Sequence, residues 1–300
     1  MNSQNPVWPE LSWPQWEATA TTLHMYTQII GKTRLALTPK QNHWWNVALV
    51  VTARGISTGA MPLPDGSLLE IEFDFLAHCL RFSTSDGRTE SLPLQPQSVA
   101  SFFASYREVL GRLHVNVAIN PKPVELKDPV RFDLDEMHKS YDEDAAQRFW
   151  RALSLTSNVL KEFCGRFCGK VSPVHFFWGS FDLAMTRFNG RRAPPRDGAD
   201  AIQAEAYSHE CISAGFWPGN GGYGQAAFYA YLAPVPPALG TARYTGPGRF
   251  HQELGEYIFN YEEARSAPDP HAALLEFLQN TYEVCAAVGG WNRAELDCRR

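Results

Sequence analysis

Ser172-Pro173-Val174-His175-Phe176-Phe177-Trp178 is the stretch of sequence that predicts the fold, because an earlier stretch has the same order of residue types. The earlier stretch begins at Thr38-Pro39 and continues with His43-Trp44-Trp45. In both places a hydroxyl-bearing residue and a proline precede a histidine that is followed by large aromatic side chains. Each stretch also follows a helix-like segment and precedes strand-like segments that end in another helix. The pattern predicts an old internal duplication.

The duplication predicts an α+β fold of two pseudo-repeated halves, each with the order helix–antiparallel sheet–helix. The first half is expected to cover residues 1–120, and the second half, which has longer loops, residues 143–300. Residues 121–142 contain several prolines and little periodicity, so they are expected to be a linker. Because the space between related halves often holds a ligand, we expect the functional site there.

In the first half, a helix is expected from Ser12-Trp13-Pro14 to Gly31, which closes it. Residues 46–54 have the composition of a buried strand. Residues 69–75 alternate between apolar and acidic side chains, as in a strand with one face in solvent. The remaining expected elements are a hairpin of strands 80–84 and 88–92 around Asp86-Gly87, and a helix over 99–113.

In the second half, residues 144–165 have an apolar helical stripe. Residues 174–188 predict one long strand, or two strands joined by a kink at Gly179. The other expected elements are strands at 206–216, 226–233 and 256–261, and a last helix between Asp269-Pro270 and Gly289-Gly290. The glycine-rich residues 219–224 lack the Lys-Ser/Thr of a phosphate loop, which favours a mobile lid.

Composition excludes several classes of protein. The formal net charge of −5 argues against nucleic-acid and membrane-surface binding, both of which need an excess of Lys and Arg. No apolar run is long enough for a transmembrane helix, and the first ten residues do not have the pattern of a secretory signal. Six cysteines without a CxxC pair suggest a reducing cytoplasm. Cys164 and Cys168 could share a helix face as metal ligands, although small buried apolar side chains fit their spacing better.

His43 and His175 occupy matching places in the two related stretches. Two histidines related by a pseudo-twofold axis could meet a substrate or a metal from both sides. Alternatively, each imidazole ties a turn to the backbone beside a large aromatic side chain. A metal site would also need a third or fourth ligand.

Tyr207 and His209 would project to the same face of a strand, which makes them a candidate pair for proton transfer. Trp217 follows and could form a pocket wall. A hydrogen-bonded polar strand end explains Tyr207 and His209 equally well.

Asp182 lies in a run that is apolar on both sides, so its carboxylate is expected to be buried and paired or hydrogen-bonded. Four nearby arginines could supply the partner or clamp an anionic substrate, and the alternative is a solvated basic loop: Arg187, Arg191, Arg192 and Arg196. Trp178 is expected to line the same pocket. His251, Glu253 and Glu256, with His175 and His209, form only a weak candidate set for zinc or iron, because no HExxH-like spacing is present.

Four blocks of this sequence resemble a family of mostly bacterial proteins that is known as a domain of unknown function. The blocks are Asn42-His43-Trp44-Trp45, residues 172–182, residues 187–195 (Arg-Phe-Asn-Gly-Arg-Arg-Ala-Pro-Pro), and Tyr207-Ser208-His209-Glu210 with Phe216-Trp217-Pro218-Gly219. The resemblance covers nearly the whole chain. It implies a cytosolic protein of about this length, and it supplies no activity, cofactor or catalytic residue.

The residues themselves favour an enzyme that acts on a small, anionic molecule in an aromatic-lined pocket. In this hypothesis His175 and His209 transfer protons or bind a divalent metal, Asp182 orients them, and Arg191 or Arg192 holds the anion. The alternatives are a non-catalytic small-molecule-binding protein and a protein-interaction scaffold. The sequence leaves open the reaction, the substrate, the presence of a metal and the oligomeric state.

Overall fold

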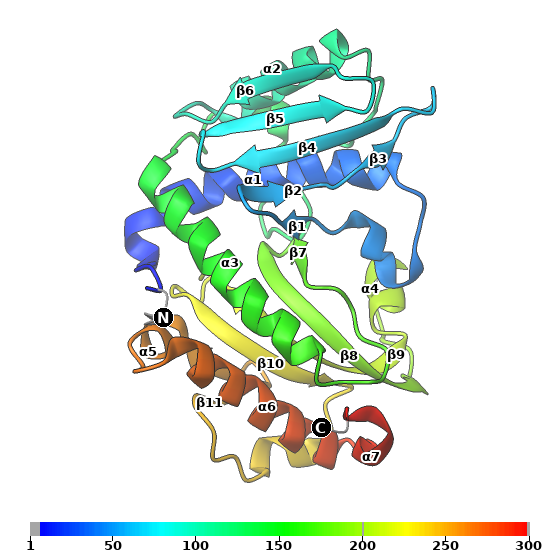
Figure 1. Ribbon diagram of the computed structural model, residues 1–300, viewed down its shortest axis with the longest axis vertical. Helices are drawn as coiled ribbons and strands as arrows, with labels where there is room; N and C mark the ends of the chain where they lie inside the picture. The colour runs from blue at the N-terminus through cyan, green and yellow to red at the C-terminus, as the bar shows by residue number, and fades with distance from the viewer. Residues whose placement is uncertain (1–6, 200, 299–300) are drawn as a thin grey trace, which may run out of the picture.

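Two antiparallel sheets form the core of this computed structural model, which describes residues 7–199 and 201–298 (Figure 1). The first sheet has the strand order β1-β2-β4-β5-β6, with β3 paired to β4, and the second has the order β11-β12-β10-β9-β8-β7. The strands of the first sheet are β1 (Val50–Val51), β2 (Gly55–Ser57), β3 (Met61–Pro62), β4 (Leu68–Asp74), β5 (Cys79–Thr84) and β6 (Thr89–Pro93). Those of the second are β7 (His175–Phe177), β8 (Asp182–Arg192), β9 (His209–Trp217), β10 (Ala227–Ala233), β11 (Arg249–His251) and β12 (Glu256–Asn260).

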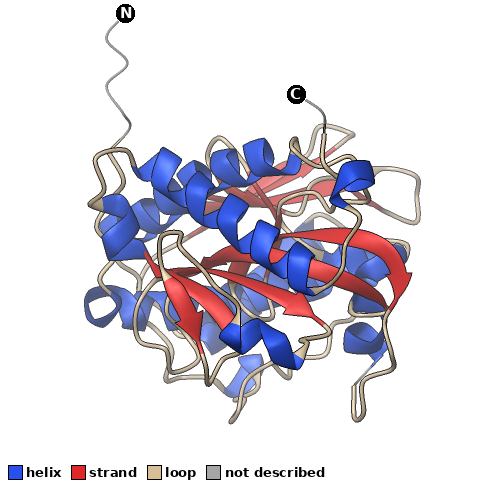
Figure 2. Cartoon of the chain, turned by 90° about the horizontal axis from the view of Figure 1, so that it is seen from below, coloured by secondary structure: helices blue, strands red, loops and turns tan. Residues whose placement is uncertain are grey.

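Long helices pack along these strands (Figure 2). In Figure 1, α1 lies below the first sheet, and α3 and α6 run across one face of the second. The helices are α1 (Trp13–Leu37), α2 (Val99–Arg112), α3 (Glu143–Cys164), α4 (Ala201–Ala206), α5 (Tyr261–Arg265), α6 (Pro270–Val288) and α7 (Arg293–Leu296), with 3-10 turns η1 (Asn42–Val47), η2 (Phe132–Leu134) and η3 (Pro237–Thr241). No helix in the described ranges is both long and apolar enough to cross a bilayer.

Side-chain caps start two of the long helices, α3 and α6. Asp142 accepts a hydrogen bond from the Ala145 backbone N–H at 2.7 Å at the start of α3, and Asp269 accepts one from Ala272 at 3.0 Å at the start of α6. Both caps satisfy N–H groups that have no partner inside the helix. The α+β class and the order helix–antiparallel sheet–helix in each half are confirmed.

The predicted end of the first helix at Gly31 is wrong, because α1 continues to Leu37. Gly31 has a packing role instead: a Cβ at this position would overlap the indole ring of Trp178. The missing side chain lets Trp178 lie directly against the helix backbone, where its Nε1 donates to the Val47 carbonyl at 2.8 Å. Trp178 is therefore a core residue that joins the two halves.

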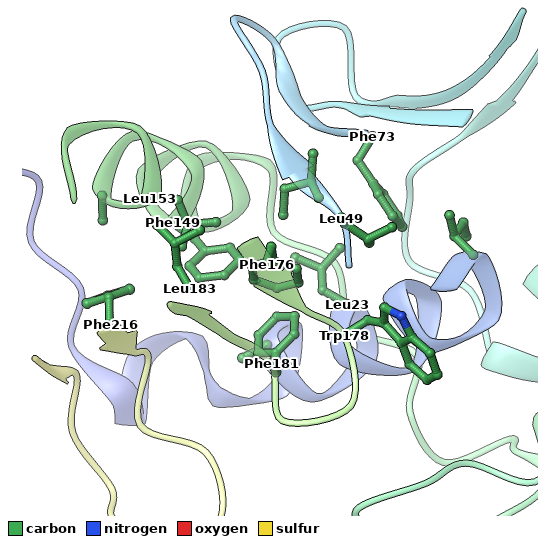
Figure 3. Close-up of a cluster of buried hydrophobic side chains, with 14 of the residues drawn as sticks. Leu23, Leu49, Phe73, Phe149, Leu153, Phe176, Trp178, Phe181, Leu183 and Phe216 are labelled. Atoms are coloured by element: carbon green, nitrogen blue, oxygen red, sulfur yellow. The ribbon is translucent and has the colours of Figure 1, made fainter. Parts of the chain in front are cut away.

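The two stretches that resemble each other in sequence lie in contact. The Leu49 N–H donates to the Phe176 carbonyl at 2.9 Å, and the Phe176 N–H donates back to Leu49 at 2.8 Å. This pair links the residue before β1 to β7, and therefore one sheet to the other. Figure 3 shows the apolar cluster around the link, with Leu49, Phe176, Phe181 and Trp178 among side chains from α1 and α3.

The expected strand at residues 46–54 is wrong in extent, because only Val50–Val51 of this segment are in a strand. Most of the preceding stretch forms η1, in which His43 and Trp44 have left-handed φ values of 56° and 58°. His175 lies in β7, so the two histidines have different backbone environments. The internal duplication stays a prediction.

Residues 174–188 form two strands, β7 and β8, joined by a turn, as one of the two alternatives predicted. Phe181 in this turn has φ 61° and is buried, stacked between His24 and Phe149 at ring-centroid distances of 4.9 and 5.2 Å. A left-handed residue other than glycine is strained, and tight packing holds it in place. The turn fixes where β8 begins, and β8 begins with Asp182.

Candidate functional site

The second sheet has two chemically different faces. Leu183, Met185 and Phe216 alternate into the main apolar core beneath α3 and α6. The opposite face, which we call the outer face, carries the residues between them, since strand side chains alternate. It consists of His175 and Phe177 (β7), Asp182, Ala184, Thr186 and Phe188 (β8), Cys211, Ser213, Gly215 and Trp217 (β9), Ala227, Tyr229, Tyr231 and Ala233 (β10), and Glu256 and Ile258 (β12).

Strand pairing places one row of these residues side by side. His175 pairs with Ala184, Ala184 pairs with Gly215, and Gly215 pairs with Tyr229. Large and small side chains therefore alternate across the sheet. The Tyr229 ring can lie flat over the small residues beside it.

Asp182 is the buried acid of the outer face. Its carboxyl group accepts hydrogen bonds from the hydroxyls of Ser180 and Tyr229. In the described part of the chain no cationic side chain forms an ion pair with it. Burial raises the pKa of Asp182 above its ordinary value, against the opposing effect of the two hydroxyls.

Gly215 makes the contact between Tyr229 and Asp182 possible. Tyr229 and Asp182 are two strands apart, with β9 between them. A Cβ at position 215 would lie 2.6 Å from the Tyr229 hydroxyl oxygen and would also overlap the Leu183 carbonyl. Only glycine leaves room for the phenol to cross β9 and reach the carboxyl group.

Glu256 is a second acid on the outer face. Burial, with a smaller contribution from the negative charge of Asp182, raises the pKa of Glu256 to about 7. Burial and the charge of Asp182 also raise the pKa of Tyr229 well above its usual value. A carboxyl group with a pKa near neutrality can give up or accept a proton under ordinary conditions.

His175 lies at the edge of this face and is buried. Its Nδ1 has no hydrogen-bond partner among the described residues. Burial, together with the charge of Arg34, lowers the pKa of His175 to about 4. The ring is therefore neutral at neutral pH, with Trp45 and Phe177 at centroid distances of 6.1 and 5.7 Å.

His43 ties a turn to the backbone, as the alternative interpretation proposed. Its Nδ1 lies 3.1 Å from the Glu205 carbonyl, so Nδ1 carries the proton and Nε2 accepts from Lys170 Nζ at 2.8 Å. The ring stacks on Phe188 at 4.6 Å. The Glu205 carboxylate also accepts from the His43 backbone N–H at 3.1 Å. These contacts hold the left-handed turn of η1.

His209 lies beside His43, with ring centroids 5.7 Å apart, and its Nδ1 is 3.0 Å from the Ser208 hydroxyl. Tyr207 lies in the turn between α4 and β9, and its hydroxyl bonds to that of Tyr231 at 2.9 Å. The structure thus places Tyr207 with the tyrosines of β10 and His209 with the η1 turn. Trp45 separates His43 from His175, at 5.5 and 6.1 Å from their rings.

The arginines expected to bind an anion lie away from Asp182. Arg187 points to the core face and is fully buried, with its guanidinium carbon 3.5 Å from the Phe163 ring centroid and 4.4 Å from that of Tyr282. Burial lowers the pKa of Arg187 to about 10, so it remains charged near neutrality. Arg191 donates to Glu210 at 2.5 Å and to the Gly289 carbonyl at 2.6 Å. Arg192 is exposed near the end of β8, paired across the sheet with His209.

Trp217 forms an aromatic wall at the other end of the outer face. It stacks on Tyr223 of the glycine-rich loop with ring centroids 5.0 Å apart. That loop is fastened to the Asp182 turn, because Asn220 Nδ2 donates to the Ser180 carbonyl at 2.9 Å. A mobile-lid role for the loop stays a prediction.

Within residues 7–199 and 201–298, no group of three or more His, Cys, Asp or Glu side chains could hold a metal ion. His251 and Glu256 pair between β11 and β12. His175 and His209 lie on other parts of the sheet, so these histidines and carboxylates do not converge on one point.

Sequence reasoning missed Tyr229, Tyr231 and Gly215. The period-two alternation in residues 227–233 could have placed both tyrosines on one face. Nothing local marks Gly215, because its role depends on Tyr229 from the neighbouring strand.

A surface hollow of about 350 Å³ lies on the other side of β8, lined by Arg166, Arg187, Gln279, Tyr282, Asp297 and Cys298. The guanidinium of Arg187 is shielded from solvent there, so the hollow offers a ligand little of that charge. We therefore place the candidate site on the outer face, where the acids lie among half-exposed aromatic rings.

The fold and this face define an α+β protein with paired acids and tyrosines on one side of an antiparallel sheet. The chain belongs to a family described as "Family of unknown function (DUF5996)", whose model matches residues 8–298. No curated protein and no solved structure matches the chain.

Proposed function

We propose that the outer face binds a small molecule and exchanges a proton with it through Asp182 and Glu256. The observation that carries the proposal is the burial of Asp182 with hydroxyl partners and with no cationic partner among residues 7–199 and 201–298. Such an arrangement costs folding free energy, and perturbed acids of this kind are concentrated at functional sites.

The charges of the outer face favour a neutral or cationic ligand over the anion suggested by the sequence. Arg187 and Arg191 are engaged elsewhere, whereas two carboxyl groups lie beside the aromatic rings of Trp217, Tyr229 and Tyr231. Aromatic faces attract cations and stack on flat rings. A planar molecule with a basic nitrogen fits this chemistry best.

The two acids have different roles in the proposal. Burial favours the neutral form of Asp182, and in that form the carboxyl group can donate a hydrogen bond or a proton to the ligand. Glu256, with its pKa of about 7, is the group that exchanges its proton with solvent. His175 is neutral at neutral pH, which suits a hydrogen-bonding role at the rim of the site.

We also propose that the partner is a small molecule rather than a nucleic acid or a membrane, and that the protein acts in the cytoplasm. The net charge of −5 supports the first statement. The six cysteines, none of which is in a disulfide here, support the second.

A thermal-shift screen of neutral and cationic ring compounds tests the proposal, since a ligand that binds the folded state raises its melting temperature. We expect some compounds to bind Asp182→Asn at least tenfold more weakly than the wild type. The same compounds should bind the control Asp86→Asn as tightly as the wild type, because Asp86 lies on a distant hairpin. Compounds that stabilise all three proteins equally would contradict a site at Asp182.

Calorimetry of the best compound in buffers of different ionisation enthalpy measures proton transfer on binding. We expect proton exchange with the wild type near pH 7 and none with Glu256→Gln. Binding without proton exchange in the wild type would leave a non-catalytic binding protein.

A further inference from the structure

Two cysteines that are far apart in the sequence lie in contact at the surface. The Sγ atoms of Cys168, just after α3, and Cys298, just after α7, are 2.7 Å apart. Cys168 is exposed and Cys298 is half-buried. The sequence had suggested that Cys168 is a small buried apolar side chain facing Cys164. That suggestion is wrong, because α3 ends at Cys164 and the chain then turns outward.

Backbone hydrogen bonds hold the two thiols in place. The Cys168 N–H donates to the Leu296 carbonyl at 2.7 Å, and the Cys298 N–H donates to the Arg166 carbonyl at 3.1 Å. Phe167 and Asp297 are directly opposite in this short antiparallel bridge. Cys168 and Cys298 are therefore diagonal neighbours on one face, and their side chains already span the diagonal, since the Sγ atoms are 2.7 Å apart. A further approach to about 2.05 Å would bring the sulfur atoms to bonding distance.

The hollow of about 350 Å³ leads to this pair, because Cys298 lines it together with Arg166 and Arg187. The hollow gives a small molecule access to the pair. Oxidised glutathione and similar low-molecular-weight disulfides are therefore suitable oxidants for this position.

We propose that Cys168 and Cys298 form a reversible disulfide by exchange with a low-molecular-weight disulfide. The Cys168 thiolate attacks one sulfur of the small disulfide, which gives a mixed disulfide and releases one small thiolate. The Cys298 thiolate then attacks the Cys168 sulfur of the mixed disulfide and releases the second. Two protein thiols are oxidised, one small disulfide is reduced to two thiols, and the two protons pass from the cysteines to the leaving thiolates.

The order of the two steps follows from the surroundings. Cys168 is the more exposed thiol, so a small disulfide in solution reaches Cys168 first. The resulting bond would join the end of α3 to the segment after α7. That segment includes Asp297, which accepts from Tyr282 and from Arg293 Nε at 2.9 Å. This site is independent of the outer face, which lies on the other side of β8.

The test treats the full chain with oxidised glutathione and maps its cysteines by mass spectrometry without reduction. We expect the loss of two of the six thiols, a crosslinked peptide pair containing Cys168 and Cys298, and full reversal by dithiothreitol. Cys298→Ser should stop at the mixed disulfide and carry a glutathione on Cys168. Cys79→Ser, a change to a half-buried cysteine in the first sheet, should behave like the wild type.

The melting temperature gives a second measurement. We expect oxidation to raise it by several degrees in the wild type and in Cys79→Ser, but not in Cys298→Ser, since a crosslink between distant residues restricts the unfolded chain. A glutathione adduct on Cys168 that persists in the wild type, or crosslinks that involve other cysteines equally, would overturn the proposal.

Discussion

The two faces of β8 accommodate a buried ionisable group in opposite ways. On the core face, the Arg187 guanidinium is surrounded by aromatic rings and donates to the Phe163 carbonyl. On the outer face, Asp182 has hydroxyl partners and lies close to a second acid, Glu256. Arg187 keeps its charge near neutrality. Burial instead raises the pKa of Asp182, which favours the neutral form of its carboxyl group. On the core face, packing against aromatic rings leaves the group charged, whereas on the outer face burial disfavours the charge.

Replacing Arg187 should have the largest effect on stability. Arg187→Ala removes a fully buried side chain from among three rings and should lower the free energy of unfolding by about 3–4 kcal/mol, through the cavity and the lost ring contacts. Urea denaturation measures the loss. Arg187→Met, which keeps the length without the charge, should recover most of it. If Arg187→Met loses as much free energy of unfolding as Arg187→Ala, the positive charge itself stabilises the core face. The two faces of β8 would then differ in whether they need a charged group.

Gly215→Ala tests the crossing of Tyr229 over β9. The added methyl group would meet the phenol and the Leu183 carbonyl, so we expect a loss of about 2–3 kcal/mol in the free energy of unfolding. Gly111→Ala is the matched control, because the Cβ of an alanine there would meet nothing within 4 Å and alanine favours the helix. If Gly215→Ala has the same free energy of unfolding as the wild type, Tyr229 does not need the space over Gly215 to reach Asp182.

His175 should make the protein sensitive to acid. Its folded pKa of about 4 lies below the unfolded value of 6.5, so between these values the unfolded chain binds a proton that the folded chain does not. Stability is therefore lost as the pH falls from 6.5 toward 4. His175→Leu should reduce this loss by about 1–2 kcal/mol, measured by denaturation at pH 7 and pH 4.5. The control is His114→Asn, a change to an exposed histidine; equal effects of the two substitutions would exclude His175 as the source.

Glu256 should change the pH dependence of stability in the opposite direction to His175, and its effect should be the smallest of the four. Its folded pKa of about 7 lies above the unfolded value of 4.5, so its contribution to stability falls as the pH rises from 4.5 to 7. Glu256→Gln should therefore stabilise the protein by about 1 kcal/mol at pH 8 and hardly at all at pH 4.5, after discounting for partial exposure. Thermal unfolding at both values measures this, with the exposed Glu276→Gln as control. A gain that does not depend on pH would contradict the shifted acid.

Local patterns in the sequence predicted most of the elements correctly. Proline and acidic caps located the last helix, the Asp86-Gly87 turn located the β5–β6 hairpin, and the choice between one strand and two at residues 174–188 included the right answer. Gly31 gave a wrong end for α1. A glycine is present there because a side chain would overlap Trp178 from the other half, and not because the helix ends. Helix propensity cannot reveal a partner so distant in sequence.

The candidate site was predicted only in part. Asp182 and Trp217 lie on the outer face, and His175 lies at its rim, where sequence reasoning had grouped them. Arg187 was grouped with Asp182 although the two are five residues apart on one strand, an odd separation that sends their side chains to opposite faces. The contact between Tyr229 and Asp182 depends on strand order, which a single sequence does not encode locally.

The hydrogen-bonded pair of Leu49 and Phe176 has a consequence for solubility. A sheet normally ends in a row of open amide and carbonyl groups that can recruit a strand from another molecule, and this is a common beginning of aggregation. Here one border of each sheet, at β1 in the first and at β7 in the second, is turned toward the other. The junction thus removes one edge of each sheet from those open to pairing with a strand of another molecule.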